Sequence, residues 1–435
     1  MLPKSPLSAV QTRAGSPEPV NEDTRLKPPA HDDAPPAPSR SSLRGLDWFV
    51  FCVADVQTGF GPFVAVYLTT QKWTQIDIGL ILSVGGIVAL LGQMPGGAVV
   101  DAVRSERFVA GLAILAISIS ALTYAAFPIF PAVLAAAVLH ASASCVLGPA
   151  IAAISLGLVG HAAIGERLGR NSRFASIGNG LAAAAMGACG HFFSARAVFI
   201  ITAVLLAPTL IALRRISARE IDAERAHGGP LEHRAEKTKS YVPALLHKRP
   251  LLIFAGCVLL FHLANAAILP LMGSLLTTRS SAWATVLIAA CIVVPQLVVA
   301  AISPWVGRQS GLWGRRPLLL IGFAALPIRA LLFATVSDPR LVVIVQALDG
   351  LTAATLGVLV PLIIADLTRG TGRFNLAQGI VGTMTGIGAA ISTSLGGYLT
   401  DYFGSQIAFL GLGTIAAVAL ATAAIFMPET RPSHA

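Results

Sequence analysis

Four ionisable residues lie within long apolar stretches of this sequence, where a charge is costly: Asp55, His140, His262 and Asp349. Such residues are candidate functional groups by default, because an apolar environment penalises every charge placed in it. The same environment disfavours the charged form of a carboxylate and of an imidazole, which brings proton exchange by both groups toward neutral pH. These residue types therefore predict proton transfer within an apolar barrier.

Polar neighbours accompany two of these residues. Gln57 follows Asp55 and precedes the glycine- and proline-containing segment 59–62, in which backbone and side-chain groups can both face water or a ligand. Asn265 lies about one helical turn after His262, so both side chains could contact a substrate. The candidates for proton coupling and for the substrate cavity are therefore Asp55, Gln57, His140, His262, Asn265 and Asp349.

Structural alternatives exist for the ionisable candidates. Asp55 could be a neutral, hydrogen-bonded acid, and His262 could be a packing residue. His140 and Asp349 lie near one end of their apolar stretches, where water at a cavity rim would solvate them. Arg329 also lies close enough to the end of its stretch for its long side chain to reach the membrane interface, so we expect a structural role for it.

The elements that must position these residues are membrane helices. The 435-residue chain is 55% hydrophobic and 12% charged, with a mean hydropathy of +0.74, whereas soluble domains are about 25% charged. This composition excludes a water-soluble globular protein. Twelve apolar runs approach the ~20 residues that a helix needs to cross a bilayer: 46–70, 78–100, 108–127, 131–158, 174–193, 197–213, 250–276, 284–306, 317–336, 341–366, 375–399 and 406–427. We predict an all-α polytopic integral membrane protein with twelve transmembrane helices.

The basic residues predict the orientation of these helices. With the N-terminus in the cytoplasm, the cytoplasmic loops between runs carry 19 Lys and Arg residues and the opposite loops carry four. An excess of Lys and Arg is typical of cytoplasmic loops. We expect a multi-pass protein of the inner (cytoplasmic) or plasma membrane, with both termini in the cytoplasm.

The two halves of the chain resemble each other. Leu139-His140-Ala141 in the fourth run matches Leu348-Asp349-Gly350 in the tenth at an offset of 209 residues, and an Arg-Phe pair precedes both the fifth and the eleventh run. A duplicated six-helix unit explains these matches. The expected organisation is a disordered proline-rich cytoplasmic tail (1–42), an N-terminal six-helix bundle (43–213), a basic cytoplasmic loop (214–249), a C-terminal six-helix bundle (250–427) and a cytoplasmic tail (428–435).

A loop signature occurs twice in the chain. Its residues are Gly97, Asp101, Arg104 and Arg107 at and after the end of the second run, and Gly307, Gly314, Arg315 and Arg316 after the eighth. Both loops resemble the GxxxDxxGRR signature of the major facilitator superfamily. The first has Arg104 and Ser105 where the family has Gly and Arg, and the second has Gly311 where the family has Asp. The 428–431 segment, Pro-Glu-Thr-Arg, resembles the PETKG-type end of that family's last helix.

The resemblance implies two pseudo-symmetric six-helix bundles that rock around a midplane site, which is transport by alternating access. It also implies that the first, fourth, seventh and tenth helices line the cavity, and each of these carries one of the four ionisable candidates. An acid at a short turn can cap a helix N-terminus or pair with a neighbouring Arg, so the signature loops could latch one conformation. The alternative is a loop whose charges only set the topology.

We expect a secondary active transporter that moves a small organic solute and is coupled to protons. Efflux by antiport is favoured, because the cavity helices are apolar with few polar groups, which suits a moderately hydrophobic or cationic solute. Ala137 stands where antiporters of the family usually carry Arg, so a proton–solute uptake symporter stays open. A third alternative is a non-transporting sensor or assembly protein that has kept the fold.

Other protein classes are not expected. The sequence has no GxxxxGK[ST] loop, which argues against ATP as the energy source. It has no HExxH or CxxC motif and no Ser/His/Asp arrangement on its loops, so we expect no enzymatic activity, no catalytic residues and no metal site. We expect no cofactor, with a proton gradient as the driving force. The expected partners are a small organic solute, protons and the lipid bilayer, with no nucleic acid, and we expect a monomer.

Overall fold

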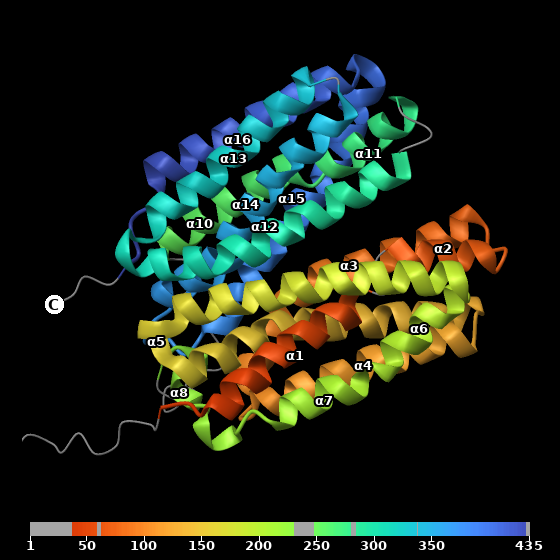
Figure 1. The fold of residues 1–435 in the computed structure, drawn as a ribbon. Coiled ribbons are helices and arrows are strands. Elements are labelled where there is room, and N and C mark those ends of the chain that lie inside the picture. Colours follow the sequence, from red (N-terminus) through yellow and green to blue (C-terminus); the bar gives the residue numbers. More distant parts are fainter. Residues whose placement is uncertain (1–36, 59–61, 230–247, 280–283, 337, 432–435) are drawn as a thin grey trace, which may run out of the picture. The chain divides into compact units, whose positions relative to one another are not determined.

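The computed structural model describes residues 37–58, 62–229, 248–279, 284–336 and 338–431, and within these ranges the chain consists of helices and their connections (Figure 1). The predicted tail therefore lies outside the described residues as far as residue 36. The helices are α1 (Arg40–Thr58), α2 (Pro62–Thr70), α3 (Gln75–Ala102), α4 (Glu106–Ala126), α5 (Phe130–Phe192), α6 (Ala195–Val204), α7 (Leu206–Arg214), η2 (Ala218–Glu220), α8 (Ala223–His227), α10 (Arg249–Asn265), α11 (Ile268–Arg279), α12 (Ala284–Leu312), α13 (Arg315–Thr335), α14 (Pro339–Leu367), α15 (Phe374–Phe403) and α16 (Ser405–Phe426).

The helices form two bundles, which lie side by side in Figure 1. Helices α1 to α8 pack around a core that includes Phe49 and Tyr67, and α10 to α16 pack around a second core that includes Phe254 and Phe323. These side chains are buried. The hydroxyl of Tyr67 donates to the backbone carbonyl of Tyr124 at 2.9 Å, which satisfies the polar end of a buried phenol.

Ten helical stretches of the described residues are long and apolar enough to cross a membrane, so the chain is a multi-pass membrane protein. One stretch belongs to α5, whose 63 residues would extend about 95 Å as a straight helix, roughly three times the hydrocarbon thickness of a bilayer. Gly160 interrupts it with φ 67° and ψ 178°. The Asn171 side chain then donates to Ser155 Oγ at 2.8 Å, so the segments on either side of Gly160 lie side by side. The count of twelve spans stays a prediction.

Three predicted runs are each divided between two helices. The run 46–70 contains α1 and α2, the run 197–213 contains α6 and α7, and the run 250–276 contains α10 and α11. At the last break, the amide of Ala267 donates to the hydroxyl of Ser392 on α15 at 3.0 Å. A neighbouring side chain thus satisfies a backbone group that the broken helix leaves free.

The structure differs from the predicted boundaries at two places. Helix α1 begins at Arg40, inside the segment predicted as a tail, because the Ser39 hydroxyl accepts a hydrogen bond from the Ser42 amide at 3.1 Å and caps the helix. The central segment 214–249 contains η2 and α8 in its described part. Asp222 caps α8 by accepting a hydrogen bond from the Arg225 amide at 3.0 Å.

Corresponding helices of the two bundles have a common spacing. Helices α4 and α13 both have 21 residues and begin 209 residues apart. Helices α5 and α14 also begin 209 residues apart, the offset found between the fourth and tenth apolar runs. Positions with this offset can be compared directly: Ser120 with Arg329, and His140 with Asp349.

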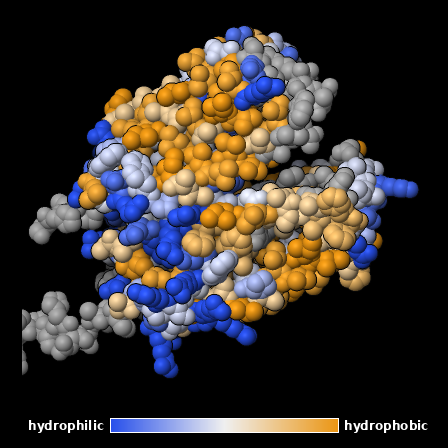
Figure 2. All heavy atoms as spheres, in the orientation of Figure 1, coloured by the Kyte–Doolittle hydropathy of each residue, from blue (hydrophilic) through white to orange (hydrophobic). Residues whose placement is uncertain are grey.

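The bundles meet at one end of α3 and separate toward the other. At the meeting end, Gly97 of α3 packs on Asn375 of α15, whereas a Cβ on Gly85 or Gly86 would meet nothing within 4 Å. We call the meeting end, which carries Arg40, Asp101, Arg315 and Glu429, the basic end, and the opposite one, which carries Ile76 and Tyr402, the far end. Figure 2 shows hydrophilic residues gathered at the basic end, and a recess between the bundles toward the far end.

Candidate functional site

The basic end is closed where α3 meets the start of α15. A Cβ on Gly97 would overlap the backbone carbonyl of Asn375, so only glycine lets the two backbones approach this closely. About one turn further along α15, Gly379 faces the backbone of Gln93 in the same way. These contacts join the N-terminal bundle to the C-terminal bundle.

Asp101 reaches across this interface and caps α15. Its Oδ2 accepts a hydrogen bond from the Leu376 amide at 2.8 Å, and its Oδ1 accepts from the side chain of Asn375 at 2.8 Å and from its amide at 3.3 Å. The first amides of a helix have no partner within the helix, and the helix dipole favours a carboxylate beside them. Arg373, at the local cap position, does not cap the helix with its side chain. The cap therefore comes from the opposite bundle.

His227 of α8 adds a titratable group to this contact. Its Nδ1 lies 3.5 Å from Oδ1 of Asp101 and its Nε2 lies 3.0 Å from Oε1 of Glu106, and all three side chains are buried. Burial lowers the pKa of the imidazole, but the carboxylates of Asp101 and Glu106 raise it more, so the pKa of His227 is raised overall. Protonated His227 therefore stabilises the cluster around Asp101.

The second signature loop is capped from within its own bundle. Gly314, at the start of α13, has a φ of 94° and no side chain to act as a cap. Glu429 takes that role by accepting hydrogen bonds from the amides of Arg315 at 2.8 Å and Arg316 at 3.0 Å. Burial raises the pKa of Glu429, but these and neighbouring amides lower it more, so its pKa is lowered overall. The guanidinium of Arg315 donates to Asp366 at 2.9 Å.

The other signature residues differ in what they contact. Gly307 of α12 packs against the backbone carbonyl of Gly165 on α5, which is a second close contact between the bundles. Arg104 is exposed and makes no side-chain hydrogen bond or ion pair with the described residues. The Nε of Arg107 is buried and has no hydrogen-bond partner in the described part of the chain. In the first loop, Gly97 and Asp101 thus carry the contact across the interface.

A cavity of about 350 Å³ lies between the bundles, with walls from α1, α3 and α5 on one side and α14 and α15 on the other. Its polar lining consists of Gln93, Asn171, Ser172 and Gln378. The sequence analysis missed all four, because an uncharged amide or hydroxyl is common in membrane helices and gives no strong signal there. Their positions on three different helices become meaningful only when the bundles are assembled.

The predicted cavity residues do not line this cavity, wherever their side chains are described. The side chains of Asp55 and Gln57 fall outside the described residues, and only the backbone of α1 places them. His140 lines a separate cavity of about 260 Å³ within the N-terminal bundle. Its Nε2 lies 3.4 Å from the hydroxyl of Ser144, one turn further along α5.

Asp349 and Asn265 are brought together by Arg329. One terminal nitrogen of Arg329 donates to Oδ1 of Asp349 and the other donates to Oδ1 of Asn265, while the amide of Gln346 lies 3.4 Å from Oδ2 of Asp349. Arg329 is only 2% exposed. The expectation that its side chain extends to the membrane interface is wrong, because the half-buried carboxylate of Asp349 holds it inside the C-terminal bundle.

His262 lies on α10, one turn before Asn265. Its ring meets the ring of Phe261 edge-on, with centroids 5.4 Å apart. Its Cβ is 3.2 Å from the place where Gly388 of α15 would carry a Cβ. His262 makes no side-chain hydrogen bond with the described residues, so its described contacts are packing contacts.

Comparison with known proteins identifies a family. Residues 48–298 and 254–435 match the sequence model of the Major Facilitator Superfamily. An uncharacterised MFS-type transporter of Mycobacterium tuberculosis (strain CDC 1551 / Oshkosh) is 38% identical over 394 residues, which cover 89% of this chain and 93% of the relative.

Two solved structures share the fold. The human organic anion transporter MFSD10 (TETRAN) aligns with a TM-score of 0.71 at 14% identity, over 88% of this chain and all of that one. The E. coli fucose:proton symporter FucP aligns with a TM-score of 0.68 at 15% identity, over 88% of this chain and 97% of that one. At these identities the likeness concerns the fold.

Proposed function

The chain belongs to the major facilitator superfamily, and from this premise we propose that it moves a small organic solute by alternating access between its two bundles. The observation that carries the proposal is the Asp101 cap, in which one bundle satisfies the helix amides of the other. A contact of this kind can be made and broken without unfolding either bundle. It therefore acts as a latch that holds the basic end closed.

The closed basic end and the separated far end correspond to one of the two states that alternating access requires. We take the cavity of about 350 Å³ between the two bundles as the solute site. Small-molecule sites are typically apolar with a few convergent polar groups, and their volumes begin at about 300 Å³. Gln93 and Gln378, from opposite bundles, are the groups that we expect to contact the solute.

We propose Asp349 and Asp55 as the groups that couple transport to protons. Asp349 is 26% exposed and is held by the buried guanidinium of Arg329. Protonation of the carboxylate removes the charge that Arg329 pairs with, so a proton and the conformation of this cluster are linked. Asp55 is included because α1, like the helix that carries Asp349, is one of the four helices expected to line the cavity.

We propose efflux by proton antiport as the direction, because the walls of the cavity are mainly apolar and suit a moderately hydrophobic or cationic solute. The proposed location is the inner or plasma membrane, with the basic end and both termini in the cytoplasm. The proton gradient is the proposed driving force, without ATP, a cofactor or an enzymatic step, and the proposed unit is a monomer.

Proteoliposomes that contain a trapped pH dye test the proposal. We expect a panel of neutral, cationic and anionic organic solutes to include one that drives a pH change with wild-type protein. Asp349→Asn and Asp55→Asn are expected to lose this signal. Asp338→Asn is the matched control, because Asp338 is an exposed helix cap and Asn caps equally well.

The sign of the pH change separates antiport from symport. Solute uptake without a pH change would overturn the coupling role of the two aspartates and leave a uniporter or exchanger. If the aspartate variants kept full coupled transport, the assignment would fail as well. Absence of all transport, with a folded protein and a wide panel, would favour a sensor or assembly protein.

A further inference from the structure

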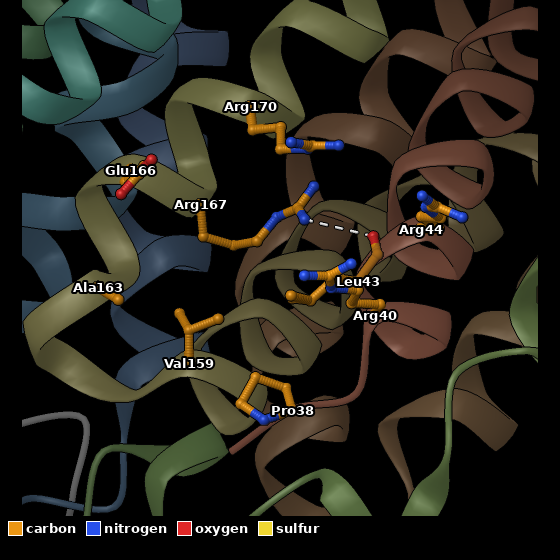
Figure 3. A pocket seen from close by; sticks show the side chains of 9 residues that line it. All are labelled: Pro38, Arg40, Leu43, Arg44, Val159, Ala163, Glu166, Arg167 and Arg170. Atoms are coloured by element: carbon orange, nitrogen blue, oxygen red, sulfur yellow. Dashed lines mark hydrogen bonds between the residues drawn. The ribbon is translucent and has the colours of Figure 1, made fainter.

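A second cavity, of about 570 Å³, lies at the basic end within the N-terminal bundle. It is separate from the solute cavity, since its walls come from the start of α1 and from the turn of α5. Figure 3 shows four arginines around it: Arg40 and Arg44 from α1, and Arg167 and Arg170 from α5. The remaining wall consists of the carboxylate of Glu166 and four apolar side chains: Pro38, Leu43, Val159 and Ala163.

The arginines are only partly neutralised. Asp47 is almost fully buried and is shared by Arg167 and Arg170, and the Nε of Arg170 lies 2.9 Å from its Oδ1. Arg40 and Arg44 are exposed and make no side-chain hydrogen bond or ion pair within the described residues. Four positive charges therefore face one buried carboxylate and the exposed Glu166, which lies apart from Arg40 and Arg44 in Figure 3.

Hydrogen bonds hold residues of the cavity wall in place. The Nε of Arg167 donates to Asn171 at 2.8 Å, and its side chain is 4% exposed. One of its terminal nitrogens approaches the carbonyl of Leu43 on α1 at 3.4 Å, the bond drawn in Figure 3. The amide of Ser39 donates to Glu220 at 2.8 Å. The Arg167–Leu43 bond links α5 to α1, and the Ser39–Glu220 bond links the start of α1 to η2.

We propose that this cavity binds the phosphate group of an anionic ligand, and that the membrane supplies it as a phospholipid headgroup. Guanidinium groups match phosphate oxygens in planar, paired hydrogen bonds, and several arginines together select a doubly or singly charged phosphate over a neutral group. The apolar wall beside them accommodates the glycerol and the first methylenes of a lipid. A soluble phosphate ester shares the recognised group and is the other source of it.

Trp48, which follows the two arginines on α1, favours a lipid as the source of the phosphate group. Arg40, Arg44 and Trp48 recur every four residues, so they share one helix face, and Trp48 is 51% exposed. Its ring contacts Phe174 of α5 edge-on at 6.3 Å, while the guanidinium of Arg170 lies 5.6 Å from the centre of the Phe174 ring. Exposed Trp beside basic residues at the end of a membrane helix is typical of the headgroup level of a bilayer.

Native mass spectrometry of the full-length protein, with added dioleoylphosphatidylglycerol or dioleoylphosphatidylcholine, tests the proposal. We expect wild-type protein to bind the phosphatidylglycerol at least tenfold more tightly, and the preference to fall as salt is raised. Arg40→Gln/Arg44→Gln is expected to reduce this binding at least tenfold. Arg214→Gln/Arg369→Gln, which removes two exposed arginines from the same end of the bundles, is expected to leave it within twofold.

Glycerol 3-phosphate forms the second arm. If it binds and competes with the lipid in wild type but not in the Arg40/Arg44 variant, the phosphate site stands and soluble esters also reach it. If glycerol 3-phosphate binds and phosphatidylglycerol does not, the lipid source is wrong. The site is overturned if the Arg40/Arg44 and Arg214/Arg369 variants lose phosphatidylglycerol binding equally, or if neither variant loses it. Thermal unfolding of each variant shows that it is folded, and solute transport is a separate readout from lipid binding.

Discussion

The two signature loops occupy corresponding places in the two bundles but hold different partners. The first carries Asp101, which caps α15 across the interface. The second has Gly311 at the place of the acid, where an added Cβ would meet nothing within 4 Å. Gly307 meets Gly165 of α5 as Gly97 meets Asn375 of α15, so the second segment of α5, which follows the break at Gly160, is the counterpart of α15.

The difference teaches that the latch depends on the loop acid, because both interfaces face a helix segment that follows a glycine with positive φ. Gly370 and Gly372 both have positive φ values, 76° and 64°, which most L residues avoid. They lie in the turn between the end of α14 at Leu367 and the start of α15 at Phe374, and the first amides of α15 are free for a carboxylate. In α5, Gly160 with φ 67° precedes the second segment in the same way, but the second loop has Gly311 in place of the acid and supplies no carboxylate to that segment.

A second comparison concerns the bundle interiors. The C-terminal bundle places Arg329 against Asp349, whereas the equivalent positions of the N-terminal bundle are Ser120 and His140. Ser120 donates to the carbonyl of Ala136 at 2.7 Å. The C-terminal bundle thus has an ion pair with one fully buried partner, Arg329, where the N-terminal bundle has a serine hydrogen bond and a histidine.

The largest effect is expected for Gly97→Val. The new side chain would overlap the Asn375 carbonyl, so the basic end cannot close and transport falls at least a hundredfold in proteoliposome flux assays. Gly85→Val, on the same helix, meets open space and is expected to keep at least half of the wild-type rate. Equal rates for the two variants would show that the α3–α15 contact is not needed.

Arg329→Leu tests the ion pair. Removing one partner of a buried pair costs about 3 kcal/mol, and we expect the free energy of unfolding in detergent to fall by roughly that amount. Ser120→Ala, at the equivalent position of the other bundle, is expected to cost about 1 kcal/mol. Adding Asp349→Leu to Arg329→Leu should restore part of the loss, and a further loss instead would contradict the pairing.

Asp101→Asn tests the cap on α15 that crosses the interface, and Glu429→Gln tests the cap on α13 within one bundle. The variant weakens the charge-assisted cap on α15 by about 1 kcal/mol, which shifts the balance between open and closed basic ends severalfold. Spin-label distances between the exposed far-end positions Ile76 and Tyr402 report this shift. Glu429→Gln, which alters a cap inside one bundle, is expected to lower stability without moving that distance.

The smallest effect is a pH dependence of the latch. Because the pKa of His227 is raised in the closed structure, its stabilisation is complete below the ordinary histidine pKa of about 6.5 and is lost as pH rises through the raised value. We expect the closed fraction to fall a few-fold in the same distance measurement as pH rises. His227→Gln should remove this dependence, and a profile that stayed unchanged would exclude His227 as its source.

The sequence alone determined the class of the protein. Long apolar runs and the recurrence of residues at an offset of 209 are local or periodic properties, and a bilayer favours a helix wherever such a run is long enough to cross it. The orientation that follows from the asymmetry of Lys and Arg stays a prediction. The signature loops and the 428–431 segment then identified the family, and the comparisons confirmed it. The loop acid Asp101 also stood out, because an acid at a short turn can cap a helix or pair with a neighbouring Arg.

Only the tertiary structure decided which partner each charge has. Asp101 binds amides more than 270 residues away, Arg329 pairs with Asp349 on another helix, and His227 comes from a short helix in the central segment. No periodicity encodes such pairs, because they arise when bundles pack and buried polar groups must each find a partner. The same physics placed Gln93 and Gln378 in one cavity and gathered arginines from α1 and α5 at another.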